Sequence, residues 1–306
     1  MKILVTGGAG FIGKHLIKSL LQQNHDITIF DNFSNSNKKQ ISVYSSMNVN
    51  VIDGDITNKK QILFALKEQQ VVIHLAAKIS VIESLENPQE TMKVNVEGTM
   101  NVLEGCKENK ILNVIIASSA AIFDDAGSSS KLLCENSKKN PISPYGKSKL
   151  IMEEKVLKFS KENKINCIIF RFFNIYGIGQ TDEYAGVITK FISNIQNNKT
   201  LNIFGDGLQT RDFVSIEDVV NVIISTITIS GKFGEVYNIG FGKNITIRDL
   251  ADLILKAFGK KLKIEFSEPK KGEIRFSQTS IEKAKKELEY MPKISLKEGI
   301  VKMLEI

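Results

Sequence analysis

Strand-like and helix-like hydrophobic patterns alternate along the first half of the chain. Residues 2–6 and 27–30 are short β-rich runs, and residues 12–22 between them have the 3.6-residue period of an amphipathic helix. Further runs, almost continuously apolar, occur at residues 48–52, 71–75, 112–118 and 166–170, with helical patterns at 59–68, 89–108 and 144–161. Continuous apolar runs are typical of parallel strands covered on both faces. The pattern predicts an α/β fold with a Rossmann-type doubly wound parallel sheet.

The regular alternation of strand-like and helix-like patterns ends after about residue 174. Shorter elements separated by glycines follow, which favours a smaller α+β lobe. We therefore expect a Rossmann-type domain over residues 1–173 and mainly a second, smaller lobe over residues 174–306. Residues 208–240, approximately, are expected to return to the first domain.

Composition excludes several classes of protein. The chain has 306 residues, of which 42% are hydrophobic and 25% charged, so it can bury a sizeable core and is not disordered. Its apolar runs are far shorter than the roughly 20 residues of a membrane helix, and its first residues have a strand pattern followed by glycines and not the apolar stretch of a signal peptide. We expect a soluble, cytoplasmic protein. Cys106, Cys134 and Cys167 are widely spaced, so we expect buried small hydrophobes and no metal site.

The net charge of +7 raises the question of nucleic-acid binding. The lysines occur as pairs along helix-like stretches, such as Lys138-Lys139 and Lys285-Lys286, and do not form a run interleaved with aromatic residues. This distribution favours a solvated surface over a nucleic-acid interface.

A glycine-rich segment follows the first predicted strand directly. It reads Gly7-Gly8-Ala9-Gly10-Phe11-Ile12-Gly13 and precedes an amphipathic helix. Small residues in this setting allow a tight turn and a close approach of the backbone to a pyrophosphate at the helix N-terminus. Asp31 ends the second strand 18 residues after Gly13. A carboxylate at this distance binds ribose hydroxyls and repels a 2′-phosphate, so NAD is favoured over NADP.

Candidate catalytic residues occur in the segment Ser143-Pro144-Tyr145-Gly146-Lys147-Ser148-Lys149. Ser143 is a candidate N-cap and Pro144 suits the first helical position, which places Tyr145 and Lys149 on the same face one turn apart. An ammonium beside a phenol, with a cationic nicotinamide nearby, lowers the pKa of the phenol as a general base requires. Upstream, Ser118-Ser119 ends a predicted strand at the edge where doubly wound folds bind ligands.

These motifs together resemble the extended short-chain dehydrogenases/reductases, and within them the NAD-dependent epimerase/dehydratase family. The resemblance covers nearly the whole chain. Further motifs that carry it are Gly54-Asp55-Ile56, His74-Leu75-Ala76-Ala77, Asn95-Val96-Glu97-Gly98-Thr99, Arg171-Phe172-Phe173-Asn174-Ile175-Tyr176-Gly177 and Gly205-Asp206-Gly207-Leu208-Gln209-Thr210-Arg211-Asp212-Phe213-Val214.

The resemblance implies roles for individual residues. Tyr145 would be the base, Ser119 would bond the sugar hydroxyl, and Lys149 would bind the nicotinamide ribose. The cofactor-binding set would be Gly7, Gly10, Phe11, Ile12, Gly13, Asp31, Asn32, Asp55, Ile56, Leu75, Ala76, Ala77, Asn95, Tyr145, Lys149 and Phe172. The substrate set would be Ser119, Asn174, Arg211, Lys270, Glu273 and Ser277, with Asn174 and Arg211 on the diphosphate of a nucleotide sugar, most simply a UDP-sugar.

One difference within the family is visible in the chain. Dehydratases carry at least one carboxylate directly after the strand-end hydroxyl, whereas this chain has Ala120 and Ala121 there. Elimination of water then lacks its acid/base group, but epimerisation at C4 through a 4-keto sugar needs none. Lys270 stands where Arg is usual, and Lys is a point charge without the Arg fork. Ser277, a small residue, suggests room for an N-acetyl group.

Apolar residues on the helices 91–108 and 144–160 exceed what one buried face requires, which predicts a homodimer through a four-helix bundle, as in related enzymes. Burial of both helices within one large subunit is the alternative. For function, a one-way reductase of 4-keto nucleotide sugars stays open, and so, further away, does a non-catalytic NAD-binding or RNA-binding protein.

Overall fold

The computed structural model describes residues 1–123, 132–180, 186–269 and 274–304. These residues form two compact units. The N-terminal unit contains Met1–Ile122, Lys139–Arg171 and Val220–Tyr237, and the C-terminal unit contains the described parts of Phe123–Lys138, Phe172–Val219 and Asn238–Ile306. Each unit is described by itself.

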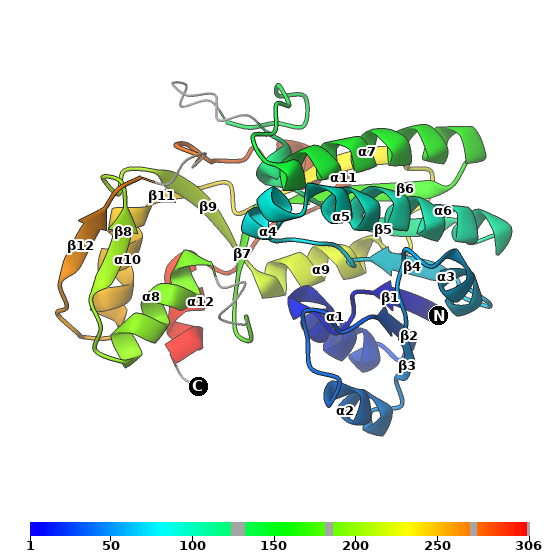
Figure 1. Cartoon of the computed structure of the whole chain (residues 1–306), viewed down its shortest axis with the longest axis horizontal. Coiled ribbons are helices and arrows are strands. Elements are labelled where there is room, and N and C mark those ends of the chain that lie inside the picture. The colour runs from blue at the N-terminus through cyan, green and yellow to red at the C-terminus, as the bar shows by residue number, and fades with distance from the viewer. Residues whose placement is uncertain (124–131, 181–185, 270–273, 305–306) are drawn as a thin grey trace. The chain divides into compact units, whose positions relative to one another are not determined.

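A seven-stranded sheet organises the N-terminal unit (Figure 1). Its strands lie in the order β10 (Phe233–Ile239), β6 (Asn166–Phe172), β5 (Asn113–Ser119), β4 (Val71–His74), β1 (Lys2–Thr6), β2 (Asp26–Asp31) and β3 (Asn50–Asp53). The pairs β1–β2, β1–β4, β2–β3 and β4–β5 are parallel. The central order 3-2-1-4-5-6 is that of a Rossmann fold, so the predicted fold class is confirmed.

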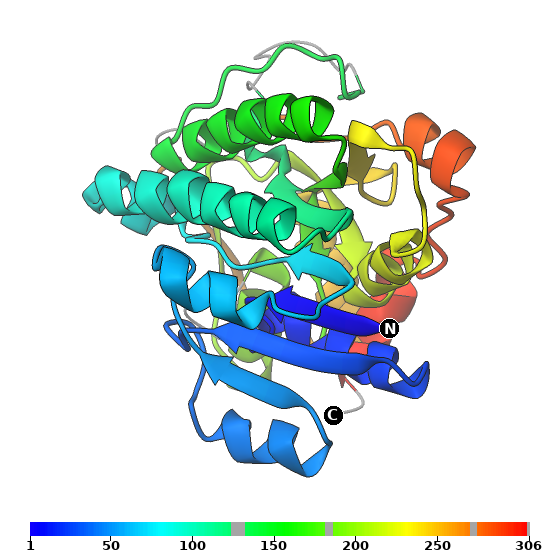
Figure 2. The ribbon, with the colours of Figure 1, turned by 90° about the vertical axis from the view of Figure 1, so that its right-hand side faces the viewer.

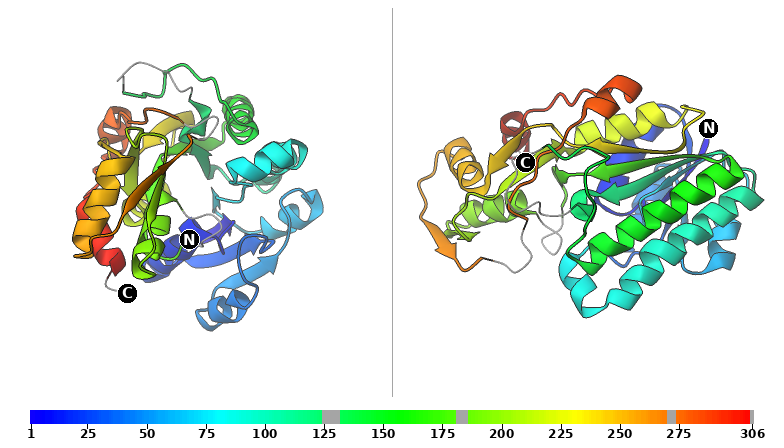
Figure 3. Two further views of the ribbon diagram at one scale, coloured as in Figure 1. Left: turned by 60° about the vertical axis from the view of Figure 1, so that its left-hand side comes forward. Right: turned by 90° about the horizontal axis from the view of Figure 1, so that it is seen from above.

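Helices cover both faces of this sheet. The helices of the N-terminal unit are α1 (Phe11–Gln22), α2 (Gln40–Ser46), α3 (Lys59–Ala65), α4 (Val81–Glu86), α5 (Pro88–Met92), α6 (Thr99–Glu108), α7 (Pro144–Asn163) and most of α9 (Ile216–Thr226). On one face α3 contacts α6 and α6 contacts α7, and the two long helices α6 and α7 run side by side (Figures 2 and 3). In α1 the buried residues Gly13, Leu16, Ile17 and Leu20 follow the helical period that the sequence predicts.

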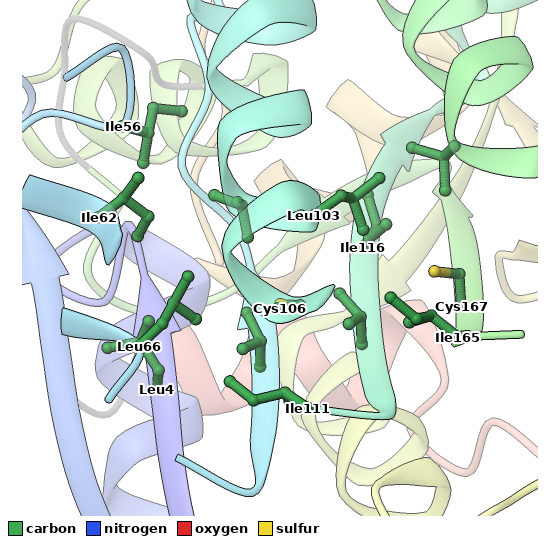
Figure 4. Close-up of a cluster of buried hydrophobic side chains, with 14 of the residues drawn as sticks. Leu4, Ile56, Ile62, Leu66, Leu103, Cys106, Ile111, Ile116, Ile165 and Cys167 are labelled. Atoms are coloured by element: carbon green, nitrogen blue, oxygen red, sulfur yellow. The ribbon is translucent and has the colours of Figure 1, made fainter. Parts of the chain in front are cut away.

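The core of the N-terminal unit lies between the sheet and the helices α3, α6 and α7. Figure 4 shows Leu103 and Cys106 of α6 among Leu4 of β1, Ile116 of β5 and Cys167 of β6. Burial on both faces explains why the strands are almost continuously apolar. Cys106 and Cys167 are buried as predicted, but Cys134 is exposed, so that expectation was wrong. Its N–H donates to Ser137 Oγ at 2.9 Å within a turn, which keeps the thiol at the surface.

The predicted helix over residues 89–108 is one continuous helical path with an irregularity. Between α5 and α6 the segment Lys93–Gly98 forms a turn of π-helix. The short helices α2 and α4 were not predicted, because neither shows an amphipathic period long enough to detect. In α4, Val81, Ile82 and Leu85 are all exposed. Among the described residues, no helix has the length and apolar character to span a membrane.

The C-terminal unit is built on two small sheets. One has the order β11 (Asn244–Thr246), β9 (Thr210–Ser215), β7 (Asn174–Tyr176), and the other pairs β12 (Ile264–Ser267) with β8 (Leu201–Phe204) in parallel. The helices α8 (Val187–Gln196), α10 (Ile247–Ala257) and α12 (Leu296–Leu304) contribute buried apolar residues to one core, and α11 (Glu282–Leu288) completes the elements of this unit. This unit therefore contains both helices and short strands, as expected for an α+β lobe.

Candidate active site

The glycine-rich turn between β1 and α1 requires glycine for steric reasons. Gly7 has a positive φ of 68°, and a Cβ there would lie 2.6 Å from the backbone nitrogen of Ala76. A Cβ on Gly13 would collide with the backbone of Gly8. Helix α1 then begins after Gly10, which has no side chain to cap it. The N–H groups of its first turn are therefore presented, without a capping side chain, where an anion can bind.

Asp31 lies at the end of β2 beside this turn. Its Oδ2 accepts a hydrogen bond from Ala9 N at 2.9 Å, and its Oδ1 accepts one from Phe33 N at 2.8 Å. Burial raises the pKa of this carboxyl, against the two backbone hydrogen bonds that lower it. Each oxygen of an ionised carboxylate retains a further acceptor site, so Asp31 can both hold the turn and accept from ribose hydroxyls. Its neighbour Asn32 is exposed, and its Oδ1 accepts from Ser34 N.

The other predicted cofactor residues lie at the ends of β3 and β4 and on the helical path after them. Asp55 is half-buried, and its Oδ1 accepts from Thr57 N at 2.8 Å. Ile56 is buried against Gly98, where a Cβ would lie 2.6 Å from Ile56 Cδ1. Leu75, Ala76 and Ala77 are half-buried directly after β4. Together with the glycine turn, these residues line the carboxyl edge of β1, β3 and β4, which is the ligand edge of doubly wound sheets.

Asn95 occupies the π-helical turn and is buried. Its side chain accepts from Lys78 N at 2.8 Å and donates to Lys78 O and Ser148 Oγ, both at 2.9 Å. Both amide donors are thus used by the protein. The structure gives Asn95 the role of tying the segment after β4 to α7.

A buried chain of hydrogen bonds that the sequence did not reveal supports this region. Thr6 Oγ1 lies 2.7 Å from His74 Nδ1, and His74 Nε2 lies 2.9 Å from Thr99 Oγ1. Burial, followed by the charge of Lys149, lowers the pKa of His74 to about 3, so the ring is neutral. This neutral ring links the strand that leads into the glycine turn to the helix α6.

Three candidate catalytic groups meet at the end of β5 and the start of α7. Ser143 caps α7 by accepting from Gly146 N at 3.0 Å, and Pro144 takes the first helical position, as predicted. Tyr145 and Lys149 are buried on the same side of α7, and a hydrogen bond joins Tyr145 to the Ser119 side chain. Lys149 Nζ donates to Ala117 O at 2.9 Å. The sequence missed Ser84, which is buried in α4 and whose Oγ accepts from Tyr145 N at 3.1 Å.

Burial sets the electrostatics of these groups. It raises the pKa of Tyr145, and the hydrogen bond with Ser119 acts in the opposite direction. Burial also lowers the pKa of Lys149 to about 8, although the charge of Glu153 opposes this. Burial thus moves the pKa of Lys149 toward neutral pH but moves the pKa of Tyr145 away from it, so the lowering that a general base requires has to come from charges beside the phenol.

Apart from Ser119, which lies in the N-terminal unit, the predicted substrate residues that are described lie in the C-terminal unit. Asn174 begins β7 and donates to Asp212 O at 2.9 Å. Arg211 on β9 donates from Nη1 to Thr210 O at 2.8 Å and to Ile274 O at 2.6 Å. Ser277 is buried, and its N–H donates to Thr210 Oγ1 at 3.2 Å. Phe172, predicted for the cofactor, is buried in this unit. Lys270 and Glu273 lie outside the described residues.

The fold and these groups define a class of protein: a Rossmann fold in which a serine, a tyrosine and a lysine come together at the end of β5 and the start of α7. The family model "NAD dependent epimerase/dehydratase family" matches residues 3–240, and the chain belongs to this family. Its cofactor is NAD. The glycine turn, the uncapped start of α1 and Asp31 fit that dinucleotide.

The chain is similar to UDP-glucose 4-epimerases and also to a dTDP-D-glucose 4,6-dehydratase. The chain is 37% identical to a putative UDP-glucose 4-epimerase of Methanocaldococcus jannaschii, over 99% of this chain and 97% of that protein. The structure resembles UDP-glucose 4-epimerase of Thermotoga maritima, solved with UDP-glucose, with a TM-score of 0.92, 31% identity and coverage of 100% and 98%. The sequence of the chain is also 34% identical to that of human dTDP-D-glucose 4,6-dehydratase, over 99% of this chain and 89% of that protein.

Proposed function

We propose that this chain is a nucleotide-sugar 4-epimerase that interconverts UDP-glucose and UDP-galactose through a 4-keto intermediate. The observation that carries the proposal is the composition of the end of β5. Ser119 is hydrogen-bonded to Tyr145, and the next two residues are Ala120 and Ala121 in a short 3₁₀ turn. A site with a hydroxyl, a phenol and an ammonium, and no carboxylate at this position, can move the O4 proton but lacks the group that a dehydratase uses for elimination.

In the proposed mechanism, Tyr145 accepts the proton from the sugar O4 and later returns it. Ser119 donates to the same oxygen and aligns it with the phenol. Bound NAD would supply a reversible hydride acceptor for C4 and would be unchanged after one full cycle. Once the 4-keto sugar has rotated in the site so that its opposite face would meet the cofactor, Tyr145 gives the proton back to O4, and the configuration at C4 is inverted. Lys149 stabilises the ionised phenol through its charge.

Arg211 and Asn174 are proposed to hold the diphosphate of the substrate. Arg211 uses Nη1 for two carbonyl oxygens, which orients the guanidinium plane. A guanidinium held in this way suits phosphate, because its fork matches two phosphate oxygens. The small buried Ser277 supports acceptance of N-acetylated sugars as well. We expect the protein to epimerise both UDP-galactose and UDP-N-acetylgalactosamine when their rates are measured side by side. No conversion of the acetylated sugar would contradict this part of the proposal.

Incubation of the purified protein with UDP-galactose and no added cofactor tests the reaction type. Formation of UDP-glucose, with no net rise in the absorbance of reduced nicotinamide, is the expected result. The alternative, a one-way reductase of 4-keto sugars, would instead need a stoichiometric supply of reduced nicotinamide and would release the oxidised form. Loss of water to a 4-keto-6-deoxy sugar would identify a dehydratase. Tightly held NAD after gel filtration favours the epimerase.

A homodimer through α6 and α7 is part of the proposal. Of the apolar residues that predicted it, Val96, Val102, Leu103, Met152 and Val156 are buried within the N-terminal unit and so do not need a partner. Others on the same helical layer remain partly exposed: Met92, Val94, Met100, Ile151, Leu157 and Phe159. Light scattering is expected to give twice the mass of one chain at micromolar concentration, and a monomer would contradict the dimer.

A further inference from the structure

A buried carboxylate lies one helical turn after Lys149 on α7. The side chains of Glu153 and Arg171 are 2% and 1% exposed, and they form an ion pair with Arg171 Nη2 and Glu153 Oε2 2.7 Å apart. Arg171 Nε also donates to Glu153 Oε1 at 3.0 Å. Ser118 Oγ donates to the same Oε1 at 2.5 Å. Glu153 therefore connects its own helix to β5 and β6.

Three consecutive residues at the end of β5 each contact a different residue of α7. Ala117 O accepts from Lys149 Nζ, Ser118 Oγ donates to Glu153, and the Ser119 side chain hydrogen-bonds Tyr145. Along β5, Ser118 lies between the two residues that contact the candidate catalytic groups. The bond from Ser118 to Glu153 therefore holds the stretch of β5 that carries the Ala117 carbonyl and the Ser119 hydroxyl.

The charge of Glu153 acts on Lys149 as well. Burial lowers the pKa of Lys149 to about 8, and the Glu153 carboxylate opposes this decrease. Near Lys149, His74 on β4 is neutral and feels the charge of Lys149, Tyr145 lies one turn earlier on the same helix, and the Glu153 carboxylate is paired with Arg171 on β6. Glu153 is the ionisable group that raises the pKa of Lys149, so the buried ammonium depends on this carboxylate to keep its proton near neutral pH.

We propose that Glu153 is a positioning residue for the Tyr145–Lys149 pair: its carboxylate fixes the end of β5 against α7, and its charge keeps Lys149 an ammonium. This inference rests on the proposed function for its kinetic consequences. The bond from Ser118 serves the first role and the negative charge serves the second. The two roles are therefore separable by mutation.

The charge is tested with the double variant Glu153→Gln/Arg171→Gln. Replacing both partners avoids burying one charge of this pair without the other, which would destabilise the fold. Loss of the carboxylate is expected to move the alkaline limb of the pH–kcat profile toward acid by about one pH unit, because Lys149 loses its proton more readily. A limb at the wild-type position would overturn this role. A merely structural ion pair would change stability or kcat without moving the limb.

Ser118→Ala is the matched variant for the other role. It keeps the carboxylate and its arginine partner but removes the bond to β5. We expect kcat to fall roughly tenfold, the energetic equivalent of one hydrogen bond to a charged group, with KM and the alkaline limb unchanged. Wild-type kcat would overturn the positioning role, and this holds even if the double variant fails to fold.

A readout independent of turnover separates this inference from the proposed function. Trace acetylation of Lys149 by acetic anhydride, followed by peptide mass spectrometry, reports the fraction of neutral amine at each pH. The double variant should become reactive at lower pH than the wild type, and identical curves would contradict the inference. Failure of the wild type to convert UDP-galactose, with the labelling shift still present, would overturn the proposed function alone.

Discussion

Each unit contains an arginine that donates hydrogen bonds to one carboxylate from two of its nitrogens. The two ion pairs differ in how far they are buried. Arg171 and Glu153 in the N-terminal unit are almost completely buried. Arg275 and Asp206 in the C-terminal unit are joined by two contacts of 2.6 Å, but their side chains are 39% and 51% exposed. A pair shielded from water acts strongly on neighbouring charges, whereas water screens an exposed pair. The buried pair can therefore act on nearby titratable groups, whereas the exposed pair acts only weakly on its surroundings.

The same contrast extends to the candidate functional groups. Tyr145 and Lys149 are buried and have pKa values shifted mainly by burial. Arg211 is half-buried and bonds backbone carbonyls. We therefore expect substitutions in the N-terminal unit to change the chemical step and those in the C-terminal unit to change substrate binding.

The largest effect is expected for Tyr145→Phe. Removing the hydroxyl that accepts and returns the proton should lower kcat by about 10²- to 10⁴-fold, the usual contribution of a general acid–base group. The phenyl ring fills the same space, so the NAD content of the purified protein and its thermal unfolding should match the wild type. A variant that keeps more than a tenth of wild-type kcat would show that another group moves the proton.

Glu153→Gln as a single substitution sharpens the comparison of the two ion pairs. It removes the Glu153 carboxylate from the buried Arg171 guanidinium, and breaking a buried ion pair in this way typically costs about 3–5 kcal/mol in the free energy of unfolding. Urea denaturation measures this directly. Asp206→Asn is the matched control, and its denaturation midpoint should stay near that of the wild type because the pair is solvated. Equal effects of the two substitutions would contradict the comparison.

Arg211→Met should act on binding. The side chain keeps its length but loses the fork proposed to hold the substrate diphosphate, so KM for UDP-galactose should rise about 10- to 100-fold, in line with the loss of a charge-assisted bond worth about 1.5–3 kcal/mol. We expect kcat at saturation to change much less. A fall in kcat with unchanged KM would place Arg211 in the chemical step instead.

The smallest effect concerns the pH dependence of stability. Burial raises the pKa of Asp212 from 3.8 to about 6, although N–H groups of Phe241, Gly242 and Thr279 bind its oxygens. The folded state binds this proton more tightly than the unfolded state, so the stabilisation is complete below about pH 4 and is lost as pH rises through about 6. Urea denaturation between pH 4 and 7 should show this slope.

Asp212→Asn should remove that part of the slope, because the side chain no longer titrates. Asp206→Asn should leave the slope between pH 4 and 7 unchanged. The hydrogen bond with Arg275 is the main cause that lowers the pKa of Asp206 to about 2, so this carboxyl does not titrate in that pH range. A slope that persists in Asp212→Asn would assign the titration to a different group.

Local patterns made much of the N-terminal unit predictable. The order of strands and helices follows from apolar runs that sheet burial demands, and the glycine turn follows from steric needs that act over a few residues. The spacing of Tyr145 and Lys149 on one helix is equally local. The π-helical turn was not predictable, because its composition does not distinguish it from a regular helix.

Contacts between residues distant in sequence explain what was missed. Glu153 follows Lys149 by four residues, so its shared helical face was a signal, but its partners Ser118 and Arg171 come from other strands. The link from Thr6 through His74 to Thr99 likewise depends on three elements. Cys134 looked like a buried small hydrophobe by composition, whereas the turn around it keeps it at the surface.

The central claim, reversible hydride transfer at C4 within one active site, is tested most directly with UDP-galactose that carries deuterium at C4. The protein is incubated with this substrate and no added cofactor, and the UDP-glucose formed is examined by mass spectrometry and NMR. Our account predicts UDP-glucose with the deuterium still at C4, since the hydride that leaves returns to the same carbon. Loss of the label to solvent, or conversion only in the presence of added reduced nicotinamide, would contradict it.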